Sequence, residues 1–200
     1  MSEDEYRTSI TLVQKMRDQY DESSWDRFTE TYTPYMRMII LSMGMRHHDM
    51  EDLVQKIILK AWKGLPEFNY KPDKGSLRSW LKTITKNTVI SHIKKKSNQE
   101  SSLNELEENS QINHNPVTEA EIYECMDKQW EVYIANLAWE NVKDEFGETV
   151  QQIFLKLSQG EDIENIAADL DVKENTVYQS RKRVKNRLYR EIRRLNYELG

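Results

Sequence analysis

Apolar side chains recur along this chain at intervals of three and four residues, the spacing of one face of an α-helix. The clearest run consists of Trp25, Phe28, Tyr32, Tyr35, Met36, Ile39, Ile40 and Met43. No run of alternating β-branched and aromatic residues reaches the length of a strand, and only six Gly and four Pro interrupt 200 residues. The pattern therefore predicts an all-α fold.

Composition excludes several classes of protein. The hydrophobic fraction of 38% is enough to form buried cores. The chain begins with an acidic segment, and nowhere do about 18 uncharged apolar residues follow one another, so we expect neither secretion nor membrane insertion. Cys125 is the single cysteine, which excludes an internal disulfide and a cysteine-based zinc site. These features predict a cytoplasmic protein.

The charges are segregated along the chain, so the net charge of −5 says little about partners. Residues 71–96 are basic, residues 100–127 carry eight carboxylates and no Lys or Arg, and residues 181–194 are basic again. An isolated basic run is commonly a solvated helix face, but two such runs flank an acidic segment here. The acidic segment is rich in Asn and Ser and contains Asn115-Pro116, which is typical of a linker.

This segregation predicts two small helical domains joined by an acidic flexible linker. The expected parts are an N-terminal extension (1–23), a first domain (24–97), the linker (98–128) and a second domain (129–200). The two domains share no repeat, so we expect them to do different jobs.

In the first domain, acidic residues at 49–52 suit the positive end of a helix dipole. The helix that follows should turn one stripe inward, namely Leu53, Val54, Ile57, Ile58, Ala61 and Trp62. The opposite face offers polar groups to a partner. Further along, turn-forming residues at 68–76 precede a basic helix that Ser76 can cap. Cations beside a loop with aromatic rings suit a single nucleic-acid strand, although a merely soluble helix is the alternative.

The second domain shows the pattern of a helix-turn-helix. A short helix over 163–170 is followed by a tight turn with Val172 as its apolar plug, and a second helix turns Val177, Val184 and Leu188 inward. The exposed face of the second helix carries amide and guanidinium groups that suit base edges in the major groove. Two ordinary packed helices are the alternative interpretation.

These motifs together resemble the sigma-70 family of RNA polymerase sigma factors, in its extracytoplasmic-function group. Residues 49–56, followed by Ala61-Trp62, are similar to sigma region two. Residues 75–81, followed by Ile84 and Asn87, resemble the segment that melts and reads the minus-ten promoter element. The helix-turn-helix resembles region four, which reads the minus-thirty-five element. Three positions depart from the family pattern: Ser91, where Asp is expected, and Asp171 and Asn175, where Gly is frequent.

The resemblance implies binding to core RNA polymerase, through its beta-prime clamp coiled coil and its beta flap, and to promoter DNA; an anti-sigma factor is a further expected partner. The implied polymerase contacts are Asp49, Glu51, Asp52, Leu53, Gln55 and Lys56. The implied minus-ten contacts are Lys71, Lys74, Arg78, Lys82, Lys86, Asn87, Lys94, Lys95 and Lys96, with Asn87 beside the pocket for a flipped base. The implied minus-thirty-five contacts are Thr176, Tyr178, Gln179, Arg181, Lys182, Arg183 and Asn186.

We expect no enzymatic activity, no catalytic residue, no metal and no cofactor. His47 and His48 are adjacent, so on a helix their side chains diverge and form no ligand pair. The acidic residues at 49–52 are accounted for as a helix start, and no phosphate-cradling glycine loop accompanies them. The alternative function is a stand-alone helix-turn-helix regulator whose N-terminal half senses a ligand or dimerises.

Overall fold

The computed structural model describes residues 7–18, 20–68, 77–103 and 119–199. All regular secondary structure in these ranges is helical, which confirms the predicted all-α fold. The chain forms two compact units, one built from residues up to Glu131 together with the last two residues, the other from Val132–Glu198. Each unit is described by itself below.

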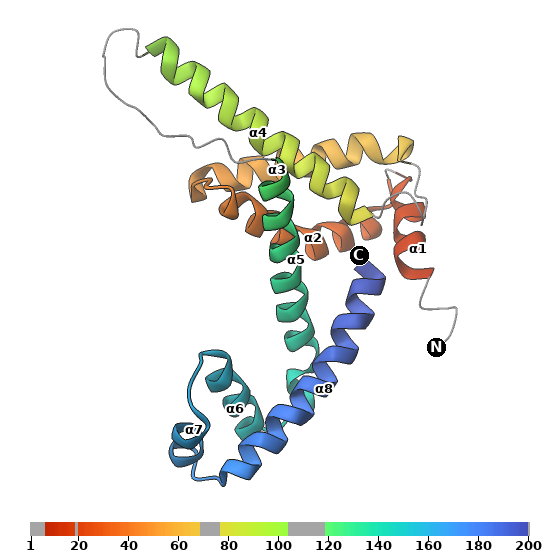
Figure 1. Ribbon diagram of the computed structural model, residues 1–200. Helices are drawn as coiled ribbons and strands as arrows, with labels where there is room; N and C mark the ends of the chain where they lie inside the picture. Colours follow the sequence, from red (N-terminus) through yellow and green to blue (C-terminus); the bar gives the residue numbers. More distant parts are fainter. Residues whose placement is uncertain (1–6, 19, 69–76, 104–118, 200) are drawn as a thin grey trace. The chain divides into compact units, whose positions relative to one another are not determined.

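The first unit contains four α-helices and the start of a fifth (Figure 1). The α-helices are α1 (Arg7–Met16), α2 (Glu22–Ser42), α3 (His47–Gly64), α4 (Leu77–Leu103) and residues 119–131 of α5 (Glu119–Val142). The short 3₁₀ helix η1 (Leu65–Glu67) follows α3. Helix α3 packs against both α2 and α4. The unit is thus a small helical bundle.

The core of this unit follows the predicted apolar spacing. From α2, Phe28, Tyr32, Tyr35, Met36, Ile39 and Ile40 are completely buried. Leu53, Ile57 and Ala61 of α3 face them, and Leu81 and Val89 of α4 complete the core. The larger aliphatic and aromatic side chains among these each contribute about 1.5–3 kcal/mol by leaving water. Ile58 and Trp62 were expected inward as well, but both are partly exposed because they lie at the edge of the stripe.

Local signals in the sequence set the ends of α2. The Asp21 carboxylate caps the helix by accepting hydrogen bonds from the Ser24 backbone N–H at 3.1 Å and the Ser23 hydroxyl at 2.8 Å. These bonds hold the pKa of Asp21 below its ordinary value. At the other end, Gly44 has a φ of +78°, which a residue without Cβ adopts freely, and the chain turns there.

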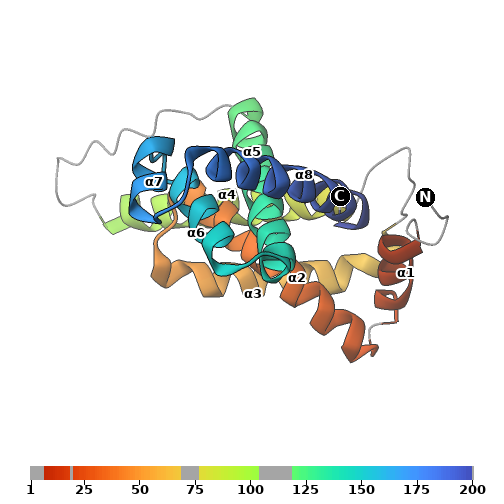
Figure 2. The same ribbon diagram turned by 90° about the horizontal axis from the view of Figure 1, so that it is seen from below.

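The second unit holds the remainder of α5, η3 (Lys143–Glu145), α6 (Glu148–Ser158), α7 (Ile163–Asp169) and most of α8 (Glu174–Leu199) (Figure 2). Its apolar interior consists of two clusters. One joins Ile153 of α6 to Ile166 and Ala167 of α7 and Val177 of α8. The other joins Val142 and Phe146 to Val184 of α8. Helix α8 is therefore anchored at two successive points along its length.

The range expected as a linker is helical at both ends. Helix α4 continues to Leu103 and α5 begins at Glu119, while residues 104–118 lie outside the described residues. The expected N-terminal extension contains α1, whose Leu12, Val13 and Met16 are buried in the first unit.

Candidate functional site

The outer face of α3 carries most of the polar residues that the sequence predicts as a docking surface. Glu51, Asp52, Gln55 and Lys56 are all exposed. Glu51 pairs with Arg37 of α2 at 3.0 Å, and Asp52 pairs with Lys56 one turn away on α3. Both pairs are open to solvent, so each contributes at most about 1 kcal/mol and leaves the groups available to a partner.

Leu53 differs from its neighbours in this predicted set. Its side chain is completely buried, because it shares the inward stripe of α3 with Ile57 and Ala61. In this structure Leu53 therefore supports the helix from beneath and is not part of the exposed face.

Asp49, also expected on that face, is turned toward α4. Its carboxylate pairs with Lys96 at 3.4 Å, with His92 at 3.7 Å and with the neighbouring His48 at 3.2 Å. Partial burial raises the pKa of Asp49, but the neighbouring side chains, His48 and Lys96 foremost, hold it below its ordinary value. Asp49 and Lys96 thus join α3 to α4, a role that neither residue was expected to have.

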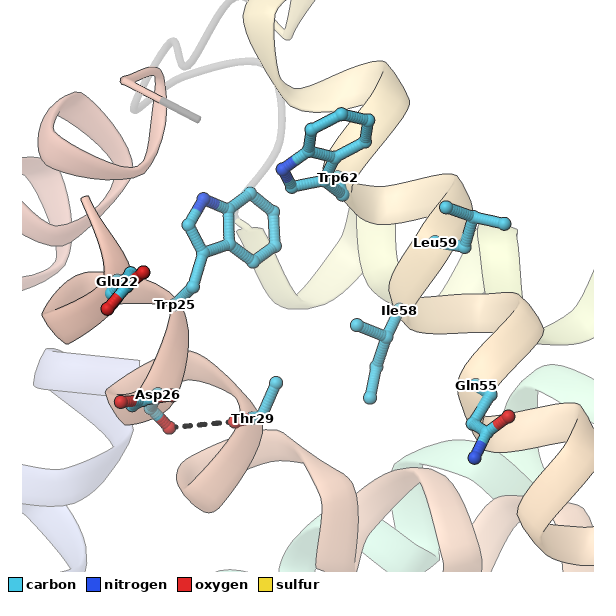
Figure 3. A pocket seen from close by; sticks show the side chains of 8 residues that line it. All are labelled: Glu22, Trp25, Asp26, Thr29, Gln55, Ile58, Leu59 and Trp62. Carbon is cyan, nitrogen blue, oxygen red and sulfur yellow. Dashed lines mark hydrogen bonds between the residues drawn. The ribbon is translucent and has the colours of Figure 1, made fainter. Parts of the chain in front are cut away.

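A groove between α2 and α3 continues the outer face of α3 (Figure 3). Trp25 of α2 faces Ile58, Leu59 and Trp62 of α3 across the groove, and Gln55 lies at its rim. Leu59 is half exposed. The groove adds apolar surface to the polar face of α3, a combination typical of protein interfaces.

The basic side chains of α4 differ in their exposure. Arg78, Lys82 and Lys86, called the α4 stripe below, were expected to contact DNA; in the structure Lys82 and Lys86 are buried, and all three contact α5. Asn87, Lys94 and Lys95 are exposed. Lys71 and Lys74, also predicted to contact DNA, lie outside the described residues.

Helices α7 and α8 form the predicted helix-turn-helix. The turn passes through Asp171, whose φ of +49° lies in the left-handed region that Asp tolerates better than most residues. Val172 packs against the cluster around Ile166 and donates its backbone N–H to the Ala167 carbonyl at 3.0 Å. The apolar plug is therefore confirmed, as is the inward position of Val177 and Val184.

The leading half of α8 presents the predicted base-reading groups to solvent. Thr176, Tyr178, Gln179, Arg181, Lys182, Arg183 and Asn186 are all exposed, and they are called the recognition face below. The Arg183 guanidinium lies over the Phe146 ring at 5.3 Å, which restrains the side chain without neutralising it. No carboxylate of the described residues pairs with Arg181, Lys182 or Arg183. Open cations and an amide on the leading turns of such a helix are the groups that read a major groove.

A buried carboxylate on the same helix is a structural feature that the sequence reasoning did not identify. Glu191 is 5% exposed and accepts hydrogen bonds from Asn141 at 3.1 Å, from Arg187 at 3.1 Å and from Arg194. These residues are called the Glu191 hub. The Arg194 hydrogen bond, with those from Asn141 and Arg187, lowers the pKa of Glu191 to about 2 against the opposing effect of burial. The signal in the sequence was Glu191 as the single acid within the basic segment 181–194.

Comparisons with known proteins place part of this arrangement in a family. Residues 28–99 match the family model described as Sigma-70 region 2. The ECF RNA polymerase sigma factor SigG of Mycobacterium tuberculosis, found in two strains, is 37% identical over 88 residues. That match covers 42% of this chain and 23% of the relative. The chain therefore spans about a quarter of the length of these curated relatives.

One solved structure, of CnrH in complex with the cytosolic domain of CnrY, is 15% identical. The superposition covers 91% of this chain and 95% of the CnrH chain, with a TM-score of 0.39. Within the described residues, no helix is both long and apolar enough to cross a membrane.

Proposed function

We propose that the chain is a member of the sigma-70 family, in its extracytoplasmic-function group, and a promoter-specificity subunit of RNA polymerase; the match of residues 28–99 to Sigma-70 region 2 supports this. In this proposal the first unit binds core polymerase and opens the minus-ten element, and the second unit reads the minus-thirty-five element. The protein acts in the cytoplasm, beside the polymerase, and catalyses no reaction itself.

The observation that carries the proposal is the order of two separate features on one chain. The segment matching Sigma-70 region 2 comes first, and a helix-turn-helix with an open basic face follows it. A helix-turn-helix alone is shared by many regulators. Its position behind a region 2 favours a subunit that needs polymerase over a regulator that acts alone.

The proposed polymerase contact is the exposed face of α3, namely Glu51, Asp52, Gln55 and Lys56, together with the apolar groove beside it. The proposed DNA contacts of the first unit are the α4 stripe with Asn87, Lys94 and Lys95. Base flipping costs a few kcal/mol of lost stacking, so a pocket beside Asn87 must compensate for that cost. The recognition face is the proposed contact with the minus-thirty-five major groove.

Transcription with purified components tests the proposal. Core polymerase is mixed with this chain and a library of randomised promoters, and we expect defined transcripts only when both proteins are present.

Asp52→Lys should weaken assembly in a pull-down, since like charges set against a partner cost several kcal/mol. Asn87→Ala should impair opening, followed by permanganate reactivity of unpaired thymines, more than initial duplex binding. Tight, sequence-specific binding to duplex DNA without polymerase would favour the stand-alone regulator instead.

A further inference from the structure

We propose that residues 119–131 of α5 are an internal competitor for the α4 stripe, so that a single DNA strand must displace them to reach it. The inference rests on the proposed function, because it concerns the same basic face of the first unit. The residues on both sides of the contact belong to that unit.

One carboxylate of α5 holds two cations of the α4 stripe. Oδ1 of Asp127 accepts from Nη2 of Arg78 at 2.8 Å and from Nζ of Lys82 at 2.7 Å. The Lys82 residue is 7% exposed, so its ammonium group lies largely out of water and depends on a polar partner within the fold. Asp127 therefore neutralises two of the three cations of the α4 stripe.

An aromatic residue of α5 holds the third cation. The Tyr123 hydroxyl accepts from Nζ of Lys86 at 3.1 Å, and the Tyr123 ring centroid lies 4.6 Å from that nitrogen. The same ring lies 5.3 Å from Nζ of Lys82. Each member of the α4 stripe thus has a polar partner on α5.

Apolar contacts seat the segment on the bundle. Met126 is completely buried and Trp130 is 2% exposed. The Tyr35 hydroxyl donates to the Met126 carbonyl at 3.2 Å, and the rings of Tyr35 and Trp130 meet edge to face at 5.0 Å. The Arg78 guanidinium also lies 4.9 Å from the Trp130 ring. The polar contacts are therefore accompanied by buried apolar contacts that hold residues 119–131 against the bundle.

The chemistry of the segment resembles that of its competitor. Single-stranded DNA offers a basic groove negative charge and flat rings. Residues 119–131 offer the same two elements, with Tyr123 and Trp130 as the rings. Their charged residues are Glu119, Glu121, Glu124, Asp127 and Glu131 against Lys128 alone. The cations of the α4 stripe can therefore exchange one ligand for the other.

The internal contact leaves room for such an exchange. Nε of Arg78 is buried and has no hydrogen-bond partner among the described residues. A phosphate can accept from Nε and Nη2 of one guanidinium together, whereas Asp127 takes Nη2. The Asp127 side chain is also 48% exposed, so water weakens its ion pairs.

The test uses the full chain and a short fluorescent oligothymidylate as the probe. Asp127→Asn keeps the shape of the side chain and removes its charge. We expect it to bind the probe about three- to tenfold more tightly, because a larger fraction of molecules has the α4 stripe open. Amide hydrogen exchange in residues 119–131 should become faster in the same variant, and the probe should speed it in the parent protein as well.

A matched control removes the same charge from the same helix. Glu124 is exposed and pairs with Lys128 of its own helix, so Glu124→Gln should leave both the exchange and the affinity within about twofold of the parent. Tyr123→Ala should act in the same direction as Asp127→Asn.

Two results overturn the inference. One is an oligonucleotide affinity of Asp127→Asn that equals that of Glu124→Gln, and the other is unchanged hydrogen exchange in residues 119–131. Failure of the parent protein to direct transcription would overturn the proposed function instead, because the exchange measurement requires no polymerase.

Discussion

The α4 stripe and the recognition face carry similar side chains in different settings. On α4, Arg78 and Lys82 share Asp127 as a partner, and Lys82 is buried beneath α5. On α8, Gln179, Lys182 and Arg183 are exposed. The difference shows that a basic run is not a ligand site by charge alone. Its availability depends on the carboxylates that the fold brings to it.

The C-terminal half of α8 is a third case, in which the carboxylate that pairs with the basic residues, Glu191, is itself buried. Arg187 pairs with Glu145 at 2.7 Å and with Glu191, and Arg194 pairs with Glu191 and Glu198. From the sequence alone, Arg187 and Arg194 would be expected to contact phosphates or solvent. The Glu191 hub gives them a structural role instead.

The largest expected effect separates the Glu191 hub from the α4 stripe. Glu191→Ala should lower the free energy of unfolding by about 2–4 kcal/mol, because it removes a buried carboxylate that accepts hydrogen bonds from Asn141, Arg187 and Arg194. Asp127→Asn should cost less, about 1 kcal/mol, because that carboxylate is half exposed and, in the proposed exchange, residues 119–131 can open so that water reaches Lys82. Urea unfolding followed by circular dichroism measures both.

Arg193→Ala provides the control on the same helix, since Arg193 is exposed, and it should change stability by no more than about 0.5 kcal/mol. Equal losses for Glu191→Ala and Asp127→Asn would remove the distinction between a folding contact and a displaceable one.

The second largest expected effect is a loss of stability in acid, caused by protonation of Glu191. The pKa of Glu191 in the folded chain is about 2, below its ordinary value of 4.5, so the unfolded chain takes up the proton first. The ionised group therefore stabilises the fold above about pH 4.5, and this stabilisation is lost as the pH falls from 4.5 toward 2. The loss is on the order of 2–3 kcal/mol.

The measurement compares the parent with Glu191→Gln at neutral pH and near pH 3, so that the other carboxylates cancel. The stability gap between the two proteins should narrow at low pH. If the stability gap stayed constant, protonation of Glu191 would not be the cause of the loss of stability in acid.

The third prediction concerns the open half of α8. Gln179→Ala or Arg183→Ala should cost about 1–3 kcal/mol on the preferred minus-thirty-five sequence and relax the preference at one or two base pairs. Arg187→Ala should lower stability and leave the selected sequence unchanged. Selection from a randomised minus-thirty-five library with core polymerase distinguishes these outcomes. Altered base preference in Arg187→Ala alone would show that the register of the recognition face is wrong.

The smallest expected effect is a response to salt. Raising the ionic strength from about 0.05 M to about 0.5 M screens exposed charges more than buried ones. The free energy of opening of residues 119–131 should therefore fall, by less than about 1 kcal/mol, and their hydrogen exchange should become faster. Exchange in the helices around Glu191 should not change. Equal acceleration in both places would mean that the two contacts are equally open to solvent.

Periodic burial explains why much of the fold could be predicted. Phe28, Tyr32 and Ile39 recur on one face of α2, and the same rule placed Val177 and Val184 inside the helix-turn-helix. Leu53 shows the limit of motif reasoning. Its neighbours suggested an interface, but the spacing to Ile57 and Ala61 put it in the core.

Pairing between distant residues explains what could not be predicted. Arg78 and Asp127 are 49 positions apart, and Asn141 and Glu191 are 50 apart. Such contacts depend on how helices pack, and no local spacing encodes them. The acidic segment could be recognised as acidic, but its target could not be identified before the helices were placed.

The left-handed Asp171 in the turn of the helix-turn-helix bears on how freely this position can change over evolutionary time. Glycine would relieve the backbone strain but lose more entropy on folding, and these two effects of about 1 kcal/mol oppose each other. Asn tolerates the same backbone angles. Asp, Asn and Gly can therefore replace one another here at nearly constant stability. A β-branched residue, whose Cβ clashes at a φ of +49°, is excluded, so this turn permits neutral drift among three amino acids.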